Sequence, residues 1–442
     1  MRKSKLPAMM FMGIIALSSI LGGFLLFQDS TPPSVALSHQ ATIISPTAEV
    51  ILTVADSQSP IKKVLIQAHW EGRVLPIFEK RFTDEEIQKT IPFSLKDIGL
   101  REGAIELEIT VTDASLAWFG QGNTASTRLP LLIDARPPKI SIKTSQPNVR
   151  RGGAASILYS VSKEPTTTGV YVSGLFFPAH KQANGDYLCF FAFPYYMETK
   201  DFKPEVVAVD AAGNRQANPV DTYRINRTFK QDSINISQGF LDQKAYEFEA
   251  MAPGDMTPIE RFLKVNGVVR RASTDRVYEI ARETHPEMLW SGTFLRMPKS
   301  APRAGFADHR SYIWEGQKVD EQTHLGLDLA SVQRDNVPAS NTGKIIFADY
   351  LGIYGNLVII DHGAGVHSLY SHLSEITVET GEDVQRGDII GKTGATGMAG
   401  GDHLHFGITV GGLEVTPIEW LDPKWIKDNI TSRLKEAGLP VE

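Results

Sequence analysis

Gly401-Asp402-His403-Leu404-His405-Phe406 is the stretch that decides how the carboxy-terminal third of this 442-residue chain folds. In a β-strand, residues two apart project from the same face, so His403 and His405 are predicted to point the same way. Leu404 and Phe406 then face a hydrophobic core. The stretch therefore predicts a strand with two imidazoles on one face and two anchoring apolar side chains on the other.

Two further segments carry histidine, namely His324-Leu-Gly-Leu-Asp328 and Tyr370-Ser-His372-Leu373, and seven of the 11 histidines lie between His309 and His405. Gly326 makes a helix across the first segment costly. A catalytic zinc takes three protein nitrogen or oxygen ligands and leaves its fourth position to water. The segments offer five candidate groups, and spare imidazoles beside a metal suit acid–base catalysis. Together they predict a hydrolytic zinc site.

Other polar residues have simpler interpretations. A lone histidine is ordinarily a structural or surface residue, and His-x-His alone is a weak motif. We assign such structural or surface places to His309, His362 and His367. Asp402 has two interpretations, a group that orients a ligand or a turn residue. Asp210 and Asn214 are interpreted as a turn rather than a calcium site.

The region around these segments is predicted to be a β domain spanning 301–425. Glycines recur at seven positions between 381 and 401, as expected for tight hairpins. A helix and tail are predicted for 422–442, with Asp422-Pro423 at its start and Gly438 at its end. The preceding part, 228–300, is predicted to be a helical connector or prosegment-like element. Its first helix starts at the capping box Thr257-Pro-Ile-Glu260 and ends at Asn266-Gly267, and a second runs from 274 to 284.

Two β modules are predicted upstream, at 35–135 and 136–227. Residues 48–54 and 104–111 alternate apolar and polar side chains, which is typical of strands with one buried face. Asp134-Ala-Arg-Pro-Pro138 is interpreted as a stiff junction between the modules. Modules of this size resemble bacterial immunoglobulin-like β-sandwiches. The fold class is therefore mainly β, with two sandwiches, a helical connector and a terminal β domain.

Residues 1–30 are predicted to be a cytoplasmic tip and a transmembrane signal anchor. The run 7–27 holds 21 residues without a charge, which is enough to cross a bilayer, and Arg2, Lys3 and Lys5 precede it. A cleaved signal peptide is the alternative, although its apolar region would be shorter, at about 7–15 residues. Either interpretation exports the rest of the chain. We expect a single-pass protein of the bacterial inner membrane with its bulk in the periplasm or outside the membrane.

Composition excludes several other classes of protein. Hydrophobic residues make up 42% and charged residues 22%, so the chain is globular rather than disordered or fibrous. Lys and Arg total 45 against 51 Asp and Glu, a net charge of −6, which argues against nucleic-acid binding. The one cysteine, Cys189, excludes a disulfide framework and a zinc site built from cysteines.

At residues 300–425 the chain resembles the lysostaphin-type (LytM-like) zinc metallopeptidases, which cut the peptide part of bacterial cell walls. The likeness includes the three histidine segments and the stretches 355–363 and 384–391. It implies a compact antiparallel, barrel-like β-sheet domain with one Zn²⁺ in a groove, held by His324, Asp328 and His405. It also implies that His372 and His403 are catalytic. The segment Gly305-Phe-Ala-Asp-His-Arg310 departs from the family pattern, and no role is predicted for it.

The resemblance implies a zinc metalloendopeptidase, a peptidoglycan hydrolase that cuts cross-links between stem peptides with a zinc-activated water. Zinc lowers the pKa of bound water toward about 7 and polarises the carbonyl, while His372 and His403 share proton transfer and oxyanion stabilisation. The division between them is open. The two sandwich modules would be a spacer, or an arm that binds wall material or divisome proteins.

Three alternatives differ in class. A non-catalytic LytM-like regulator that activates another wall hydrolase typically lacks several of the five positions, and this chain has all of them. A lipoyl-like carrier would need a lysine at a hairpin tip, where this chain continues into His-Leu-His. A surface adhesin built from the sandwiches leaves the histidines unexplained.

Overall fold

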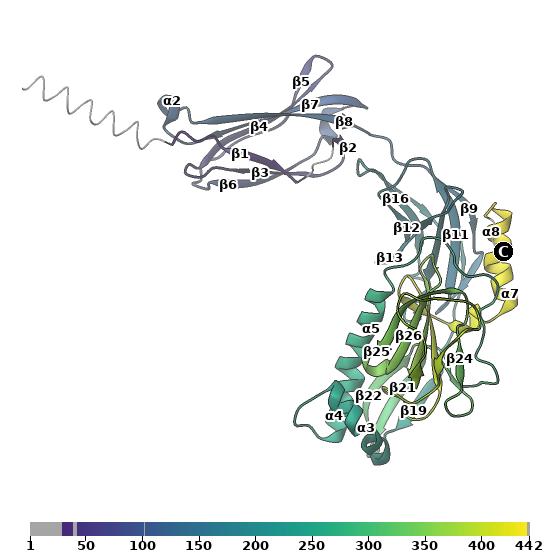
Figure 1. The fold of residues 1–442 in the computed structure, drawn as a ribbon. Coiled ribbons are helices and arrows are strands. Elements are labelled where there is room, and N and C mark those ends of the chain that lie inside the picture. The colour runs from purple at the N-terminus through teal and green to yellow at the C-terminus, as the bar shows by residue number, and fades with distance from the viewer. Residues whose placement is uncertain (1–28, 39–41, 101, 440–442) are drawn as a thin grey trace, which may run out of the picture. The chain divides into compact units, whose positions relative to one another are not determined.

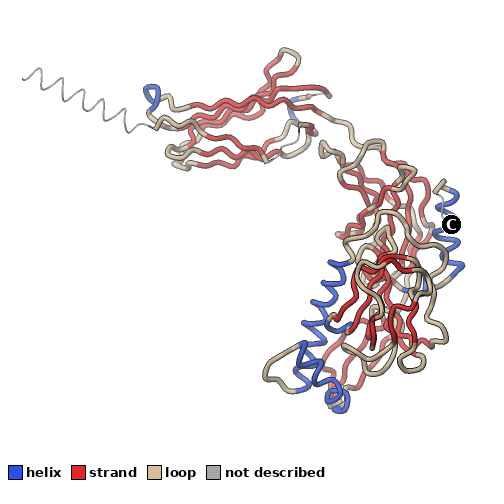
Figure 2. Tube along the Cα trace, viewed as in Figure 1, coloured by secondary structure: helices blue, strands red, loops and turns tan. Residues whose placement is uncertain are grey.

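A computed structural model describes residues 29–38, 42–100 and 102–439, and strands dominate it (Figures 1 and 2). The prediction of a mainly β chain is confirmed. Within the described ranges, no helix is long and apolar enough to cross a membrane. The predicted anchor at 7–27 lies outside those ranges. The chain divides into two compact units, one reaching Pro138 and including Val209–Arg215, the other formed by Lys139–Ala208 and Gln216 onward.

The first unit contains two mainly antiparallel sheets around one core, because its strands alternate buried and exposed side chains. In β7 (Gly103–Asp113), Ile105, Leu107, Ile109 and Val111 are buried between more exposed polar neighbours. The smaller sheet has the order β1 (Ser34–Leu37), β3 (Val50–Ala55), β6 (Gln88–Phe93). The larger has the order β2 (Ile43–Ile44), β8 (Thr124–Ile133), β7, β4 (Ile61–Trp70), β5 (Arg73–Arg81). Short helical turns are η1 (Lys96–Ile98) and α2 (Ala117–Gly120). The immunoglobulin-like assignment stays a prediction.

The second unit begins with two more four-stranded sheets. One has the order β14 (His180–Lys181), β15 (Tyr187–Ala192), β11 (Ala154–Val161), β9 (Ile140–Ser145). The other has the order β13 (Leu175–Pro178), β12 (Thr167–Val172), β16 (Pro204–Val209), β17 (Arg215–Pro219). A parallel pair joins β10 (Asn148–Arg150) to β18 (Tyr223–Ile225). Every residue of β15 is buried, so both of its faces are covered.

The large sheet of the carboxy-terminal domain is antiparallel throughout. Its order is β20 (Ala301–Ala304), β23 (Leu327–Ala330), β31 (Leu404–Val410), β27 (Val366–Leu373), β26 (Asn356–Asp361), β25 (Gly343–Tyr350), β29 (Asp383–Val384), with β32 (Leu413–Val415) beside β31. A small sheet has the order β24 (Asn336–Pro338), β30 (Ile389–Lys392), β28 (Glu375–Ile376). A third has the order β19 (Gln231–Asn235), β21 (Asp308–Trp314), β22 (Gln317–His324). The turn η3 (Gly352–Tyr354) precedes β26.

Helices occupy a narrower stretch than 228–300, namely α3 (Gln238–Met251), α4 (Pro258–Lys264), the π-helix η2 (Val265–Val269) and α5 (Arg270–Ile280). The predicted capping box is present, because Thr257 accepts from the Glu260 amide and Glu260 accepts from the Thr257 amide. The predicted stop at Asn266-Gly267 is wrong. The chain passes through it as a π turn, in which buried Asn266 donates to Asp320 over 2.7 Å. This tertiary contact offsets the low helix propensity of the pair.

From Asp422 onward the carboxy-terminal end is helical, as predicted, with α7 (Pro423–Ile426), the π-helix η4 (Lys427–Thr431) and α8 (Ser432–Glu436). The short helix α6 (Pro417–Trp420) precedes them, inside the stretch predicted to be a β domain. These helices lie beside β9 and β11 (Figure 1). Trp420, Trp290 and Phe190 meet with ring centroids 5.6–6.3 Å apart, and Ser156 donates to the Asn429 carbonyl over 3.1 Å. One continuous core therefore joins the 139–227 sheets to the carboxy-terminal domain.

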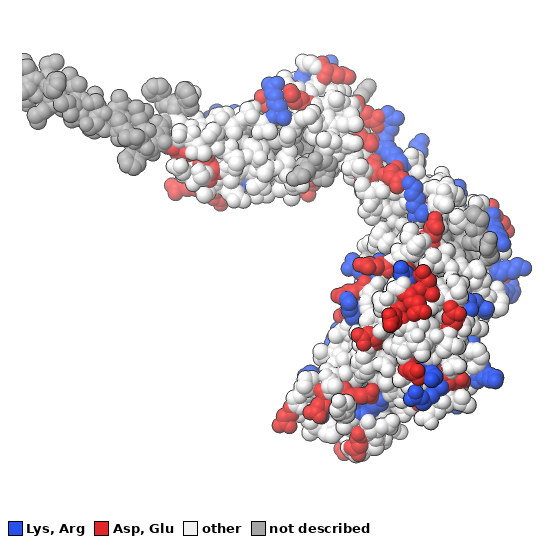
Figure 3. Space-filling model, in the orientation of Figure 1, with Lys and Arg blue, Asp and Glu red and all other residues white. Residues whose placement is uncertain are grey.

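Surface charge is mixed in sign. Lys and Arg side chains are interspersed with Asp and Glu over the face drawn in Figure 3, in keeping with the totals of 45 and 51. A face of mixed sign does not favour binding of a polyanion.

Candidate functional site

The five predicted site residues come from four strands of the carboxy-terminal domain. His324 ends β22, Asp328 lies in β23, His372 in β27 and His405 in β31, while His403 immediately precedes β31 and bridges to Gly394. Asp328 and His405 are cross-strand partners. Leu404 and Phe406 are each 2% exposed, so the apolar face of this strand lies in the core as predicted. The structure brings all five residues to one place, while their roles stay predictions.

Three of them form a compact set of donor atoms. His324 Nε2 lies 2.9 Å from Asp328 Oδ1 and 3.0 Å from His405 Nδ1, and the last two atoms are 2.9 Å apart. Zinc ligands placed tetrahedrally about 2.0–2.1 Å from the ion lie roughly 3.3 Å apart, so this set fits zinc within a few tenths of an ångström. Two imidazole nitrogens and one carboxylate oxygen are also the donor types of a catalytic zinc centre.

Backbone carbonyls set the ring orientations. His324 Nδ1 lies 2.7 Å from the Gly305 carbonyl, His372 Nδ1 lies 2.9 Å from that of Thr396, and His403 Nδ1 lies 2.8 Å from that of Gly401. Because a carbonyl oxygen only accepts, each Nδ1 carries the proton and each Nε2 keeps its lone pair. For His324 this is the support that a metal-binding histidine ordinarily has.

His372 has an unusual backbone, with φ at +64°. Between the pairs Asn356–Leu373 and Val358–Tyr370 the register shifts, so β27 carries one extra residue there. Such a bulge redirects a side chain, and a positive φ in a bulky residue is strain that tends to gather at functional sites. The His372 ring lies 5.0 Å from that of His403 and 5.8 Å from that of His405, centroid to centroid.

Burial and the shared carboxylate shift the ionisation of this group. Burial alone would raise the pKa of Asp328, but its close contacts with the His324, His403 and His405 rings outweigh burial and hold that pKa well below the ordinary value. Burial lowers the pKa of His405 to about 4. Burial, followed by the neighbouring imidazoles, also holds the pKa of His372 well below its usual range. Neutral imidazoles and an ionised carboxylate are the forms that bind a metal ion.

Gly326 provides room for His405. A Cβ at position 326 would lie 2.5 Å from His405 Cε1 and Nε2 and 2.9 Å from the Phe406 carbonyl oxygen. No side chain fits at that distance. The glycine in the middle of His324-Leu-Gly-Leu-Asp328 is therefore required by the packing of the third ligand candidate against the first two.

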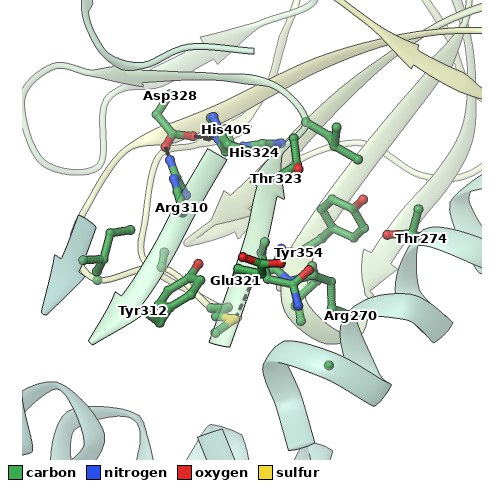
Figure 4. Close-up of a pocket in the computed structure, with 18 of the residues that line it drawn as sticks. Arg270, Thr274, Arg310, Tyr312, Glu321, Thr323, His324, Asp328, Tyr354 and His405 are labelled. Atoms are coloured by element: carbon green, nitrogen blue, oxygen red, sulfur yellow. Dashed lines mark hydrogen bonds and ion pairs between the residues drawn. The ribbon is translucent and has the colours of Figure 1, made fainter. Parts of the chain in front are cut away.

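A pocket of about 810 Å³ opens beside these residues (Figure 4). The imidazoles and Asp328 line it together with side chains of the helices and of β21, namely Phe240, Phe262, Arg270 and Tyr312. The Arg270 guanidinium donates to Asn266 Oδ1 over 2.7 Å and contacts the Met398 sulfur over 3.1 Å, so its position is fixed. The helical segment thus contributes directly to the space in front of the predicted metal ligands.

Arg310 and Gly305 are site residues to which the sequence assigned no role. Arg310 Nη2 donates to Asp328 Oδ2 over 3.1 Å, on the side away from the donor set (Figure 4). In the β21–β22 hairpin Asp308 pairs with His324 and Arg310 with Gln322, so Arg310 shares a face with His324. A hairpin turn at Glu315-Gly316, where both φ values are positive, is visible in the sequence, but it does not reveal this pairing because the register shifts by one residue between Tyr312 and Ile313.

The other candidates have structural places. His362 is buried between the Thr342 carbonyl and the Ser368 hydroxyl, each 2.7 Å from a ring nitrogen. His367 is buried, and its Nε2 lies 3.5 Å from Asp361 Oδ1. His309 lies 3.4 Å from Glu321 at the pocket edge. Asp402 accepts from Thr393 and from the Arg334 amide, so it holds a turn.

Asp210 also has the turn geometry that the sequence predicts. Its Oδ1 accepts from the amides of Ala212 and Asn214 over 3.0 and 2.9 Å, as in an Asx turn.

Comparisons with known proteins agree with this geometry. Residues 322–417 match the model of peptidase family M23. Over 95 residues the chain is 42% identical to DD-carboxypeptidase/endopeptidase Mpg of Neisseria meningitidis serogroup B, covering 22% of each. It is 36% identical over 96 residues to peptidoglycan DD-endopeptidase ShyA of Vibrio cholerae, covering 22% of each. It is 34% identical over 96 residues to murein hydrolase activator EnvC of Escherichia coli, covering 22% of this chain and 23% of EnvC.

The matched part therefore spans about a fifth of this chain and of each of these relatives. Among solved structures, the catalytic domain of lysostaphin from Staphylococcus simulans is 28% identical, with a TM-score of 0.24, covering 28% of this chain and 92% of that domain. All five predicted site residues lie within 322–417. Residues 322–417 are accordingly a LytM-type domain of peptidase family M23.

Proposed function

We propose that this protein is a membrane-anchored, exported zinc metalloendopeptidase that hydrolyses peptide bonds in peptidoglycan cross-links. The observation that carries the proposal is the set His324, Asp328 and His405, whose donor atoms lie 2.9–3.0 Å apart beside two further imidazoles. ShyA, a relative named as a peptidoglycan DD-endopeptidase, supports the substrate class.

The spare imidazoles are placed for proton transfer. His372 and His403 each have Nδ1–H held by a carbonyl, which leaves Nε2 to accept or return a proton at the substrate. A bound zinc would supply the Lewis acidity that polarises the scissile carbonyl and lowers the pKa of water. The 810 Å³ pocket has room for several residues of a peptide next to these groups.

The anchor and compartment are part of the same proposal. The uncharged run 7–27 with three preceding basic residues supports insertion in the inner membrane with the bulk of the chain in the periplasm. In that arrangement the β modules stand between membrane and wall, where they would act as a spacer or bind wall material or a divisome protein.

Digestion of purified peptidoglycan by the full-length chain, with and without a chelator, tests the activity. Products are identified by mass. We expect new peptide termini that disappear with chelator. Asp328→Ala and His405→Ala should lose both zinc and cleavage, while His372→Ala should keep zinc and lose cleavage by about 10²-fold or more. His69→Ala, outside the peptidase domain, should retain both.

A second candidate function is that of a non-catalytic regulator of wall hydrolases. The observation that favours it is the similarity to EnvC, which is named as a murein hydrolase activator. A regulator would show no cleavage by itself and would increase digestion by an added wall hydrolase, with or without chelator. Such a result, together with zinc-independent enhancement by Asp328→Ala, would replace the proposed hydrolase with this role.

A further inference from the structure

A second cluster of carboxylates lies in the first unit, far along the chain from the histidines. One carboxylate oxygen from each of Asp29, Asp56 and Asp113 lies within 4.8 Å of the others. Asp56 follows β3 of the smaller sheet, Asp113 ends β7 of the larger sheet, and Asp29 precedes β1. The cluster therefore joins the two sheets at one end.

Much of the hydrogen bonding here has a purely structural explanation. Asp113 accepts from the amides of Ser115 and Asn123, and the Asn123 side chain donates to Asp113 and to the carbonyls of Asp29 and Thr31. A similar arrangement occurs at Asp210, where the Asn214 side chain donates to Asp210 and to the Asp134 carbonyl. An Asp–Asn clip of this kind closes a loop, and it does not by itself indicate a ligand.

The Asp–Asn clip does not explain the environment of the Asp56 carboxylate. Its side chain is more than nine-tenths buried, and its Oδ1 accepts from the amides of Gln58 and Ser59, each over 2.8 Å. Its Oδ2 is buried without a hydrogen-bond partner. Leaving a charged oxygen buried and unpaired is costly, so such an atom ordinarily has a cation or a donor beside it.

No basic side chain compensates these charges within the described residues, because no Lys, Arg or His forms an ion pair with Asp29, Asp56 or Asp113. Asp29 in addition accepts a hydrogen bond from the Ser59 hydroxyl over 2.6 Å. Three carboxylates in this space would repel one another unless a positive charge lies between them.

We propose that Asp29, Asp56 and Asp113 bind one Ca²⁺ that ties the two sheets of the first unit together. Ca²⁺ takes oxygen ligands 2.3–2.6 Å away, so oxygens on opposite sides are about 4.6–5.2 Å apart, which matches a cluster confined to 4.8 Å. Carbonyl oxygens of Asp29 and Thr31 are close by through Asn123. Ca²⁺ accepts such mixed, irregular oxygen sets, whereas Mg²⁺ demands a near-octahedral one and zinc favours nitrogen and sulfur.

Calorimetric titration of the full-length chain in non-ionic detergent with CaCl₂ tests this proposal. We expect one Ca²⁺ per chain, in the range of roughly 10⁻⁴–10⁻³ M or tighter that extracellular calcium modules show. Asp56→Asn and Asp113→Asn should each weaken binding by about tenfold or more, because each removes a ligand charge. Asp84→Asn is the matched control, since that carboxylate lies in the same unit and pairs with Lys89 at the surface.

Thermal unfolding gives a second readout. At a Ca²⁺ concentration of about ten times Kd, the unfolding temperature of the first unit should rise by about 5 °C. Without Ca²⁺, Asp56→Asn should unfold at the same temperature as the unsubstituted chain or higher, because a repulsive charge is gone, and Ca²⁺ should no longer stabilise it. If Asp56→Asn fails to fold, Asp29→Asn, altered at a half-buried position, replaces it in both measurements.

The outcome of these Ca²⁺ experiments does not depend on whether the proposed peptidase activity is correct. Asp328→Ala is expected to bind Ca²⁺ as the unsubstituted chain does, since it alters only the histidine site. An absence of Ca²⁺ binding, binding unchanged in Asp56→Asn and Asp113→Asn, or an equal response to MgCl₂ would overturn the proposal, whatever the outcome with peptidoglycan.

Discussion

Arg310 holds Asp328 by the oxygen that the donor set does not use. Outer partners of this kind fix the ligand, and losing one typically costs 10–100-fold in metal affinity. We expect Arg310→Met to weaken zinc binding by about that factor, with Arg310→Lys in between, as measured by competition with a chelating dye. Arg334→Met, at an exposed pair with Glu375, serves as control. Equal zinc affinity in Arg310→Met would remove its positioning role.

Gly326→Ala tests the close approach to His405. The new methyl group would lie 2.5 Å from the imidazole, so the ring must move away from Asp328. We expect zinc affinity to fall by at least about tenfold and the unfolding temperature to drop. Gly401→Ala is the matched control, because no atom outside its immediate chain neighbours lies within 4 Å of a Cβ there. Similar zinc affinity in both variants would show that the ring relaxes without cost.

At the scale of single residues, the sequence indicates which side chains of the site lie together, but not which neighbouring residues hold them in position. Period two in a strand was enough to place His403 and His405 together. The position of Arg310 could not be predicted, because it depends on the register of the β21–β22 hairpin. The positive φ of His372 could not be predicted either, because nothing in an apolar stretch of sequence indicates where a bulge will occur. Both features come from tertiary pairing rather than from local propensity.

At the scale of the elements, helix α6 places an ionisable side chain, Glu419, in the core. Burial raises the pKa of Glu419 from 4.5 to about 7, and its carboxyl accepts from the Ala154 amide over 3.1 Å. The raised pKa means that the folded state prefers the protonated form. Its contribution to stability is therefore complete below about pH 4.5 and is lost as the pH rises through about 7.

Glu419→Gln should consequently stabilise the second unit at pH 8, by an amount on the order of 1–3 kcal/mol, and change little at pH 5. Urea unfolding at the two pH values measures the difference. Part of the pH dependence should persist, because Glu414 is also buried with its pKa raised to about 7. Glu436→Gln, exposed on α8, should behave as the unsubstituted chain. A stabilisation of equal size at both pH values would contradict the assigned titration.

Elements with strong local signals were predictable. The capping box at Thr257 and the Asp422-Pro423 helix start both occur as the sequence indicates. The π turn at Asn266-Gly267 was not predictable, since its stabilising partner, Asp320, is 54 residues away. Strand β19 escaped detection for a similar reason, because it exists by parallel pairing with β21.

For the whole molecule, the two units have separate cores, so we expect two unfolding transitions in calorimetry. Trp420→Ala should lower only the transition of the second unit, by about 3–5 kcal/mol, because it removes a fully buried ring. Residues 139–208 should unfold together with the peptidase domain rather than with the first unit. A third transition, or a shift of both by Trp420→Ala, would disprove this grouping.

The shared core around Trp420 has a consequence for how the carboxy-terminal domain can be transferred to another protein. The family match covers residues 322–417, and Trp420, just after it, packs on Phe190 and Trp290, which precede it in the chain. A fragment that starts at residue 322 and runs to the carboxy end would keep Trp420 without Phe190 and Trp290, so this ring would be exposed to solvent and would promote aggregation. Recombination that moves this domain between polypeptides would therefore have to transfer the neighbouring sheets together with it.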